Sequence, residues 1–118
     1  MKNDFQLGDV VLVNLPITHT HIQGKSRPCI VLGNKLALRY SPVITVIPLT
    51  GKCEKRMDIS CHVVIGPDET NNGLTRNSVV LCEQLTTVPK EWVFAHKGRL
   101  TSHAVGLVMA AVKRQLVG

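Results

Sequence analysis

The chain has 118 residues, the length of one domain, and no repeat or linker divides it. Hydrophobic residues make up 44% of the sequence and aromatic residues only 3%, so aliphatic side chains must form the core. The formal net charge of +6 favours a polyanion such as nucleic acid, or an acidic protein, as a partner. A basic surface that serves only solubility explains the charge equally well.

Nothing in the sequence predicts a membrane segment or a secretory signal. Residues 1–8 lack the apolar stretch of a signal peptide. No apolar run reaches the roughly 18 residues that cross a bilayer as a helix. We therefore expect a cytoplasmic protein with no membrane partner.

The cysteines agree with a reducing compartment. Cys29 and Cys82 lie within apolar patterns and read as small core hydrophobes. A zinc site built from Cys53, Cys61 and His62 is a less favoured alternative, because their spacing is not diagnostic. We expect reduced thiols, no metal and no other cofactor.

The first half of the chain predicts four short strands separated by polar segments. The strands are expected at residues 9–15, 28–34, 43–49 and 61–65. The second strand is almost entirely apolar, which indicates burial on both faces. Loops are expected at residues 17–26 and 51–59, and a crossing at residues 35–41 with Pro42 at its end.

The second half predicts two more strands and a helix. Residues 78–82 form a fifth strand that continues to Val88, where Pro89 ends it, and residues 94–100 form a short edge strand. Residues 68–76 hold a turn signal within a single helical turn at most.

The end of the chain changes to helical spacing. One face of the expected helix holds Val105, Val108, Met109, Val112 and Leu116. Thr101 or Ser102 can cap its start. Short strands followed by one helix predict a single mainly β domain over residues 1–118, built as a small, strongly curved antiparallel sheet or barrel with a C-terminal α-helix.

The loop before the second strand is a candidate site. It carries His19, His21, Gln23 and Lys25 within seven residues. An imidazole titrates near neutral pH, so either histidine can move a proton during RNA cleavage. A solvated loop whose histidines have no role is the favoured reading without further support.

Arg27 and Thr50 are the stronger candidates. Arg27 precedes Pro28, which holds its backbone extended, and a fixed guanidinium can bind two phosphate oxygens. Its alternative is a structural ion pair with Asp9 or Glu83. Thr50 ends the third strand, where its hydroxyl can donate to a phosphate oxygen or merely satisfy a turn.

An ordered set of motifs runs along nearly the whole chain. The set is Gly8-Asp9-Val10, Gln23-Gly24-x-x-Arg27-Pro28, Ser41-Pro42, Pro48-Leu49-Thr50, Gly73-Leu74, Ser78-Val79-Val80-Leu81 and Glu83-Gln84-Leu85-Thr86-Thr87. Each motif is weak alone, but their order and spacing are specific. With them the chain resembles the MazF/PemK (Kid-like) family of toxin endoribonucleases from type II toxin–antitoxin systems.

The resemblance implies an SH3-like β-barrel with a C-terminal helix, in a homodimer. It implies metal-free cleavage of single-stranded RNA, often mRNA, at short sequence motifs. It also implies a cognate antitoxin that lays an acidic segment over the RNA groove; any contact with DNA would be indirect, through that antitoxin. The catalytic roles fall to Arg27 and Thr50, and Glu83 and Gln84 lie near the RNA-binding surface.

Metal-free cleavage uses the ribose 2′-hydroxyl as nucleophile and leaves 2′,3′-cyclic phosphate and 5′-hydroxyl ends. Arg27 would stabilise the charge on the phosphorane and Thr50 would donate a hydrogen bond to it. The charged loop would bind the RNA backbone through Lys52, Lys55 and Arg56. Gln84 and residues 18–23 would read unpaired bases.

One position departs from the family pattern. Many relatives carry Ser-Glu before the Gln-Gly pair, and this chain carries His21 and Ile22 there. Either Arg27 and Thr50 suffice for the reaction, or His19 or His21 has taken over proton transfer.

Two other function classes stay open. A non-cleaving module would bind only RNA or antitoxin; the lost carboxylate favours it and the retained Arg27 and Thr50 oppose it. A gyrase poison like the CcdB toxins, which share the fold, is disfavoured, because those chains generally end in Trp-Gly-Ile and this one ends in Gln115-Leu116-Val117-Gly118.

Overall fold

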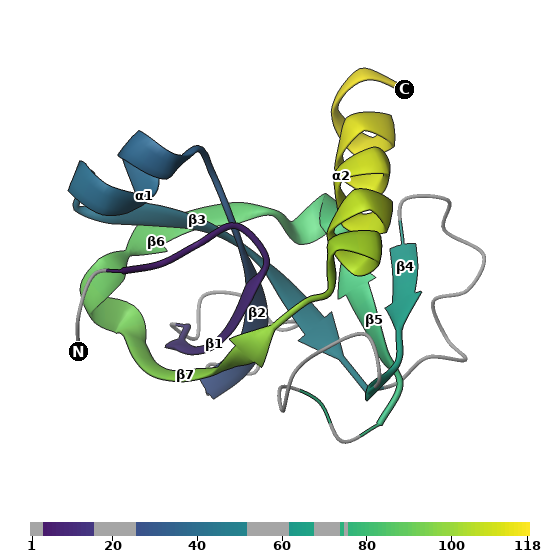
Figure 1. The fold of residues 1–118 in the computed structure, drawn as a ribbon, viewed down its shortest axis with the longest axis horizontal. Coiled ribbons are helices and arrows are strands. Elements are labelled where there is room, and N and C mark those ends of the chain that lie inside the picture. Colours follow the sequence, from purple (N-terminus) through teal and green to yellow (C-terminus); the bar gives the residue numbers. More distant parts are fainter. Residues whose placement is uncertain (1–3, 16–25, 52–61, 68–73, 75) are drawn as a thin grey trace.

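A curved antiparallel sheet carries a long helix at one end and a short helix at the other (Figure 1). The structure is a computed structural model that describes residues 4–15, 26–51, 62–67, 74 and 76–118. Its strands are β1 (Asp9–Asn14), β2 (Ser26–Leu32), β3 (Val43–Thr50), β4 (His62–Ile65), β5 (Ser78–Leu81), β6 (Thr86–Pro89) and β7 (Val93–Arg99). Its helices are α1 (Lys35–Tyr40) and α2 (Ser102–Val117), with 3-10 turns η3 (Cys82–Gln84) and η4 (Lys90–Trp92).

Strand β3 is the centre of the sheet. The strand order is β4-β5-β3-β2-β1-β7, and β6 also pairs with β3. On one flank β3 pairs with β2. On its other flank β3 pairs with β6 near its start and with β5 at its end. This double pairing bends the sheet, and it confirms the predicted mainly β fold with a curved antiparallel sheet and a C-terminal helix.

The alternation of side chains along the strands divides the apolar residues between two cores. The core under α2 includes Val10, Ile30, Ile47, Val80, Ala104 and Val108. The core on the other face includes Phe5, Val11, Cys29, Leu38, Val46 and Val88. Strand β2 supplies residues to both cores, which confirms its predicted burial on both faces.

Gly8 fixes the start of β1 against α2. Its φ is +91°, and a Cβ there would lie 2.7 Å from Cγ2 of Val105. Its amide donates to Val31 O, and its carbonyl accepts from the Leu100 amide, both at 2.9 Å. Any side chain at this position would therefore strain the backbone and push α2 away from the sheet.

The sequence predicted a crossing at residues 35–41 without assigning it a secondary structure, and most of it forms α1. Asn34 Oδ1 accepts from the Ala37 amide at 2.8 Å and caps α1. The Lys90 ammonium donates to Leu38 O, and the Lys90 amide donates to Pro42 O just beyond α1. Tertiary contacts at Leu38 thus stabilise six residues that are too few to show helical periodicity in the sequence.

The fifth predicted strand is broken where it was expected to continue. After β5, the chain makes the turn η3, in which the Leu85 amide donates to Cys82 O at 3.3 Å. It then resumes as β6. The break follows from the topology, because β5 pairs with the end of β3 and β6 pairs near its start.

Helix α2 begins as predicted, with Thr101 Oγ1 accepting from the Ala104 amide at 3.2 Å. The buried face differs from the prediction. Its buried residues are Ala104, Val108, Ala111 and Val112. Met109 is 40% exposed and Leu116 is 65% exposed. Among the described residues, neither helix has the length and apolar character that crossing a membrane requires.

Candidate active site

The sequence predicted that Arg27 precedes the second strand. In the structure Arg27 lies within β2. It pairs with Val13 of β1 and is half-buried. Pro28 follows and withholds one amide from the ladder. By alternation, the Arg27 side chain shares a face with Cys29, two residues further along the strand.

Thr50 ends β3 and is half-buried, opposite Val79 of β5. On the other flank of β3, Cys29 of β2 lies opposite Pro48. The pairing of β2 with β3 ends there, and two residues further along each strand are Arg27 and Thr50. The two residues therefore belong to the same end of the β2–β3 pair.

Beneath this pair lies an uncharged thiol. Cys29 is fully buried, and its Sγ lies 3.6 Å from Arg27 O, to which it donates. Burial raises the pKa of Cys29 to about 12, while the nearby Arg27 cation opposes that rise. The thiol therefore stays protonated at neutral pH and does not compete with a phosphate for the guanidinium.

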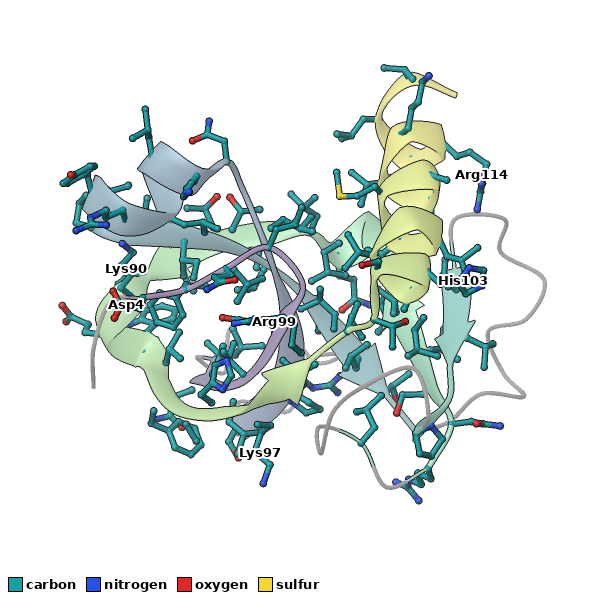
Figure 2. The ribbon with its side chains drawn as sticks, viewed as in Figure 1. Asp4, Lys90, Lys97, Arg99, His103 and Arg114 are labelled. Carbon is teal, nitrogen blue, oxygen red and sulfur yellow. The ribbon has the colours of Figure 1, made fainter. Side chains whose placement is uncertain are left out.

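Asp9 is not the partner of Arg27, which removes one of its structural readings. The buried Asp9 carboxylate accepts from Arg99 Nε at 2.8 Å and lies 3.2 Å from His96 Nε2. Figure 2 shows Arg99 lying over β1 while Lys97 points away from the sheet. Among ion pairs between described residues, none involves Arg27. Its charge is available to a ligand.

Glu83 and Gln84 lie in η3, which contacts α2, β3 and β4. Glu83 is exposed and Gln84 is half-buried. Glu83 follows Val79 by four residues, and Val79 lies opposite Thr50. The role of Glu83 stays a prediction.

Several predicted site residues lie outside the described residues. They are His19, His21, Gln23, Lys25, Lys52, Lys55 and Arg56, together with the zinc candidates Cys53 and Cys61. Of His62 only the backbone is described. The chain connects the first group to Ser26 and the second to Gly51, which are the covalent neighbours of Arg27 and Thr50. Their roles stay predictions.

Sequence reasoning missed Arg76. Its guanidinium lies against Gly51, with Nη2 only 2.6 Å from where a Cβ of Gly51 would be. The two residues are 25 positions apart and one of them has no side chain, so no local pattern could have linked them. The contact adds a second arginine to the neighbourhood of Thr50.

A family model for the PemK-like, MazF-like toxin of type II toxin–antitoxin systems matches residues 6–116. The chain belongs to this toxin family. The endoribonuclease MazF of Staphylococcus saprophyticus is 35% identical over 83 residues, which cover 70% of this chain and 67% of that protein. The resemblance drawn from the ordered motifs is confirmed.

Solved structures show the MazF-like fold as well. A mycobacterial endoribonuclease superposes with a TM-score of 0.75 at 20% identity, covering 98% of this chain and 94% of that one. MazF of Deinococcus radiodurans gives 0.74 at 18% identity, with 95% and 96% covered. A mycobacterial endoribonuclease in complex with its cognate antitoxin gives 0.72 at 18% identity, with 97% and 94% covered.

Proposed function

We propose that this MazF-like toxin is a metal-independent, sequence-specific endoribonuclease for single-stranded RNA, and that a cognate antitoxin neutralises it. The observation that carries the proposal is the pairing of β2 with β3, which ends at Cys29 and Pro48 and leaves Arg27 and Thr50 two residues beyond, at the same end of the two strands. Family membership and the endoribonuclease activity named for the relatives support it. mRNA as substrate makes the cytoplasm the expected location.

In the proposed reaction the ribose 2′-oxygen attacks phosphorus and the P–O5′ bond breaks. The products are a 2′,3′-cyclic phosphate and a 5′-hydroxyl, so the phosphate keeps its charge and the leaving oxygen gains a proton. Arg27 stabilises the negative charge on the phosphorane oxygens, and Thr50 donates a hydrogen bond to one of them. Because the nucleophile belongs to the ribose, the reaction selects RNA over DNA.

The neighbouring groups complete the proposal. His19 or His21 moves the proton, since the carboxylate usual in the family is replaced. Gln23, Lys25, Lys52, Lys55 and Arg56 bind the RNA backbone and bases near the rim, and Glu83 and Gln84 contact a flanking nucleotide. The predicted homodimer is supported by large apolar side chains that stay exposed on α2, among them Leu107, Met109 and Leu116.

The test is cleavage of a long single-stranded RNA in EDTA by wild type and Arg27→Ala. Loss of one preorganised donor to a developing oxyanion lowers the rate about 100- to 1,000-fold, and we expect a loss of that order. Wild-type products should carry cyclic phosphate ends, which are detected by their resistance to ligation until the ends are opened and dephosphorylated.

The matched control is Arg39→Ala, which removes the same charge from the exposed face of α1. It should cut at the wild-type rate. An Arg27→Ala protein that cuts at the wild-type rate would exclude the assigned role of Arg27. A folded wild type that leaves a varied RNA pool intact would favour the non-cleaving module.

A further inference from the structure

The guanidinium of Arg76 occupies the space that a side chain on Gly51 would need. A Cβ built on Gly51 would lie 2.6 Å from Nη2, 2.7 Å from Nε and 2.8 Å from Cζ of Arg76. Three atoms of one planar group at nearly equal distances mean that the plane faces the main chain. Only glycine lets the guanidinium approach the backbone this closely.

This contact lies beside the candidate active site. Gly51 follows Thr50 directly and lies in the bend after β3. Arg76 therefore packs against the main chain of the residue next to Thr50.

The same arginine joins the ends of two strands. Arg76 precedes β5 by two residues, and the Ser78 hydroxyl donates to Arg76 O at 3.4 Å. The next residue, Val79, pairs with Thr50. The backbone of Arg76 is thus anchored to β5 while its guanidinium reaches the end of β3.

We propose that Arg76 is a positioning residue for Thr50, acting through the glycine at position 51. The inference rests on the proposed ribonuclease function. Thr50 is the last residue of β3, opposite Val79 of β5, and strand ends open most easily. A flat, delocalised guanidinium stacked on the peptide restricts that motion, whereas the compact ammonium of a lysine does not. Catalytic hydroxyls must be held within about 0.5 Å of their productive position.

The experiment measures kcat and KM for RNA cleavage in EDTA by Arg76→Ala, Arg76→Lys, Gly51→Ala and the double variant Gly51→Ala/Arg76→Ala. We expect Arg76→Ala to lower kcat about tenfold with little change in KM, because misplacing a reacting group affects the transition state and not substrate binding. Arg76→Lys should be similar to Arg76→Ala.

Gly51→Ala gives the sharper result. Its φ lies outside the left-handed region, so the backbone tolerates alanine. In wild type the new methyl group must displace the guanidinium, and kcat should fall as in Arg76→Ala. In the Arg76→Ala background the space is empty, so the same substitution should cost little. Arg39→Ala again serves as the control for loss of a surface charge.

Two further readouts separate positioning from RNA binding. On a Thr50→Ala background, Arg76→Ala should have no further effect on kcat, because the group that it positions is gone. The salt dependence of RNA binding should keep its slope, whereas loss of a contact to single-stranded phosphate lowers that slope by about 0.7. Melting curves check that the unfolding midpoint of every variant lies well above the assay temperature, so that folded proteins are compared.

A raised KM with a shallower salt dependence in Arg76→Ala would overturn the inference and make Arg76 a direct RNA contact. Wild-type kinetics in Arg76→Ala would also overturn it, as would additive losses in the two double variants. Wild-type protein that cuts no RNA would remove the proposed function and this inference together. If the wild type cuts RNA and Arg76→Ala has unchanged kinetics, only the inference about Arg76 is overturned.

Discussion

Cys29 shows how a single buried residue can serve the chemistry above it without taking part. Its thiol lies on the face of Arg27, fully removed from solvent, and burial raises its pKa from 9.0 to about 12. A thiolate at this position would form an ion pair with Arg27 and withdraw it from a phosphate. Because the Cys29 thiol is protonated, it forms no ion pair with the Arg27 guanidinium.

The raised pKa predicts that Cys29 resists alkylation in the native protein. At pH 10 a thiol with a pKa of about 12 is only about 1% thiolate, and the thiolate is the reactive species. Iodoacetamide treatment followed by peptide mapping should find Cys29 unmodified at pH 8 and pH 10, and modified once urea unfolds the chain. Equal modification rates in native and unfolded protein would contradict the assigned burial.

The raised pKa of Cys29 also determines how this residue changes the stability of the protein with pH. The folded thiol has a higher pKa than the unfolded one, so its contribution to stability is complete below about pH 9 and declines as pH rises toward 12. Alkaline destabilisation is the expected direction for this residue. Its neutral state at pH 7 is the condition under which the proposed reaction takes place.

At the scale of elements, α2 shows which features of a helix follow from local sequence. Its start follows from Thr101, whose hydroxyl accepts from the Ala104 amide. Its buried face does not follow from the large apolar residues. The small side chains of Ala104 and Ala111 allow close approach to the sheet, and Met109 is turned partly to solvent.

We predict that Thr101→Ala lowers the free energy of unfolding by about 1 kcal/mol, because the Ala104 amide loses its acceptor. Urea denaturation measures the change. Ser102→Ala is the matched control, because Ser102 is the adjacent exposed hydroxyl and is not the residue that caps the helix. A larger loss in Ser102→Ala than in Thr101→Ala would place the helix start one residue later.

At the scale of the whole molecule, the Asp9 carboxylate joins residues 90 positions apart. It sits at the start of β1, accepts from the Gln6 amide at 2.9 Å, and binds Arg99 at the end of β7. Strand β7 lies at one end of the strand order, next to β1 alone in that order. This polar cluster therefore fastens an edge strand to the sheet.

Asp9→Asn should lower the free energy of unfolding by about 2 kcal/mol, because the carboxylate charge that strengthens the hydrogen bonds from Arg99 and the Gln6 amide is lost and one amide nitrogen faces a donor. Chemical denaturation reports the loss. Asp4→Asn removes the same charge from an exposed position and should change stability by less than about 0.5 kcal/mol. Equal effects of the two substitutions would show that net charge, and not the cluster, decides the result.

The sequence alone determined the strands with strong apolar patterns, the start of the C-terminal helix and the toxin family. These follow from local periodicity, capping chemistry and ordered motifs, all of which lie within short stretches of chain. Arg27 and Thr50 were identified in the same way, each from its own strand and motif, while their catalytic roles stay predictions.

The tertiary structure decided what depends on residues distant in the chain. Helix α1 forms because Lys90 and the core support Leu38, and the break at η3 exists because β3 pairs with different partners at its two ends. The pairing of β2 with β3 brings Arg27 and Thr50 to the same end of the two strands, and the bend after β3 brings the Arg76 guanidinium onto Gly51. Such contacts have no local signature, because the free energy that forms them comes from packing between segments and not from the preference of any one segment.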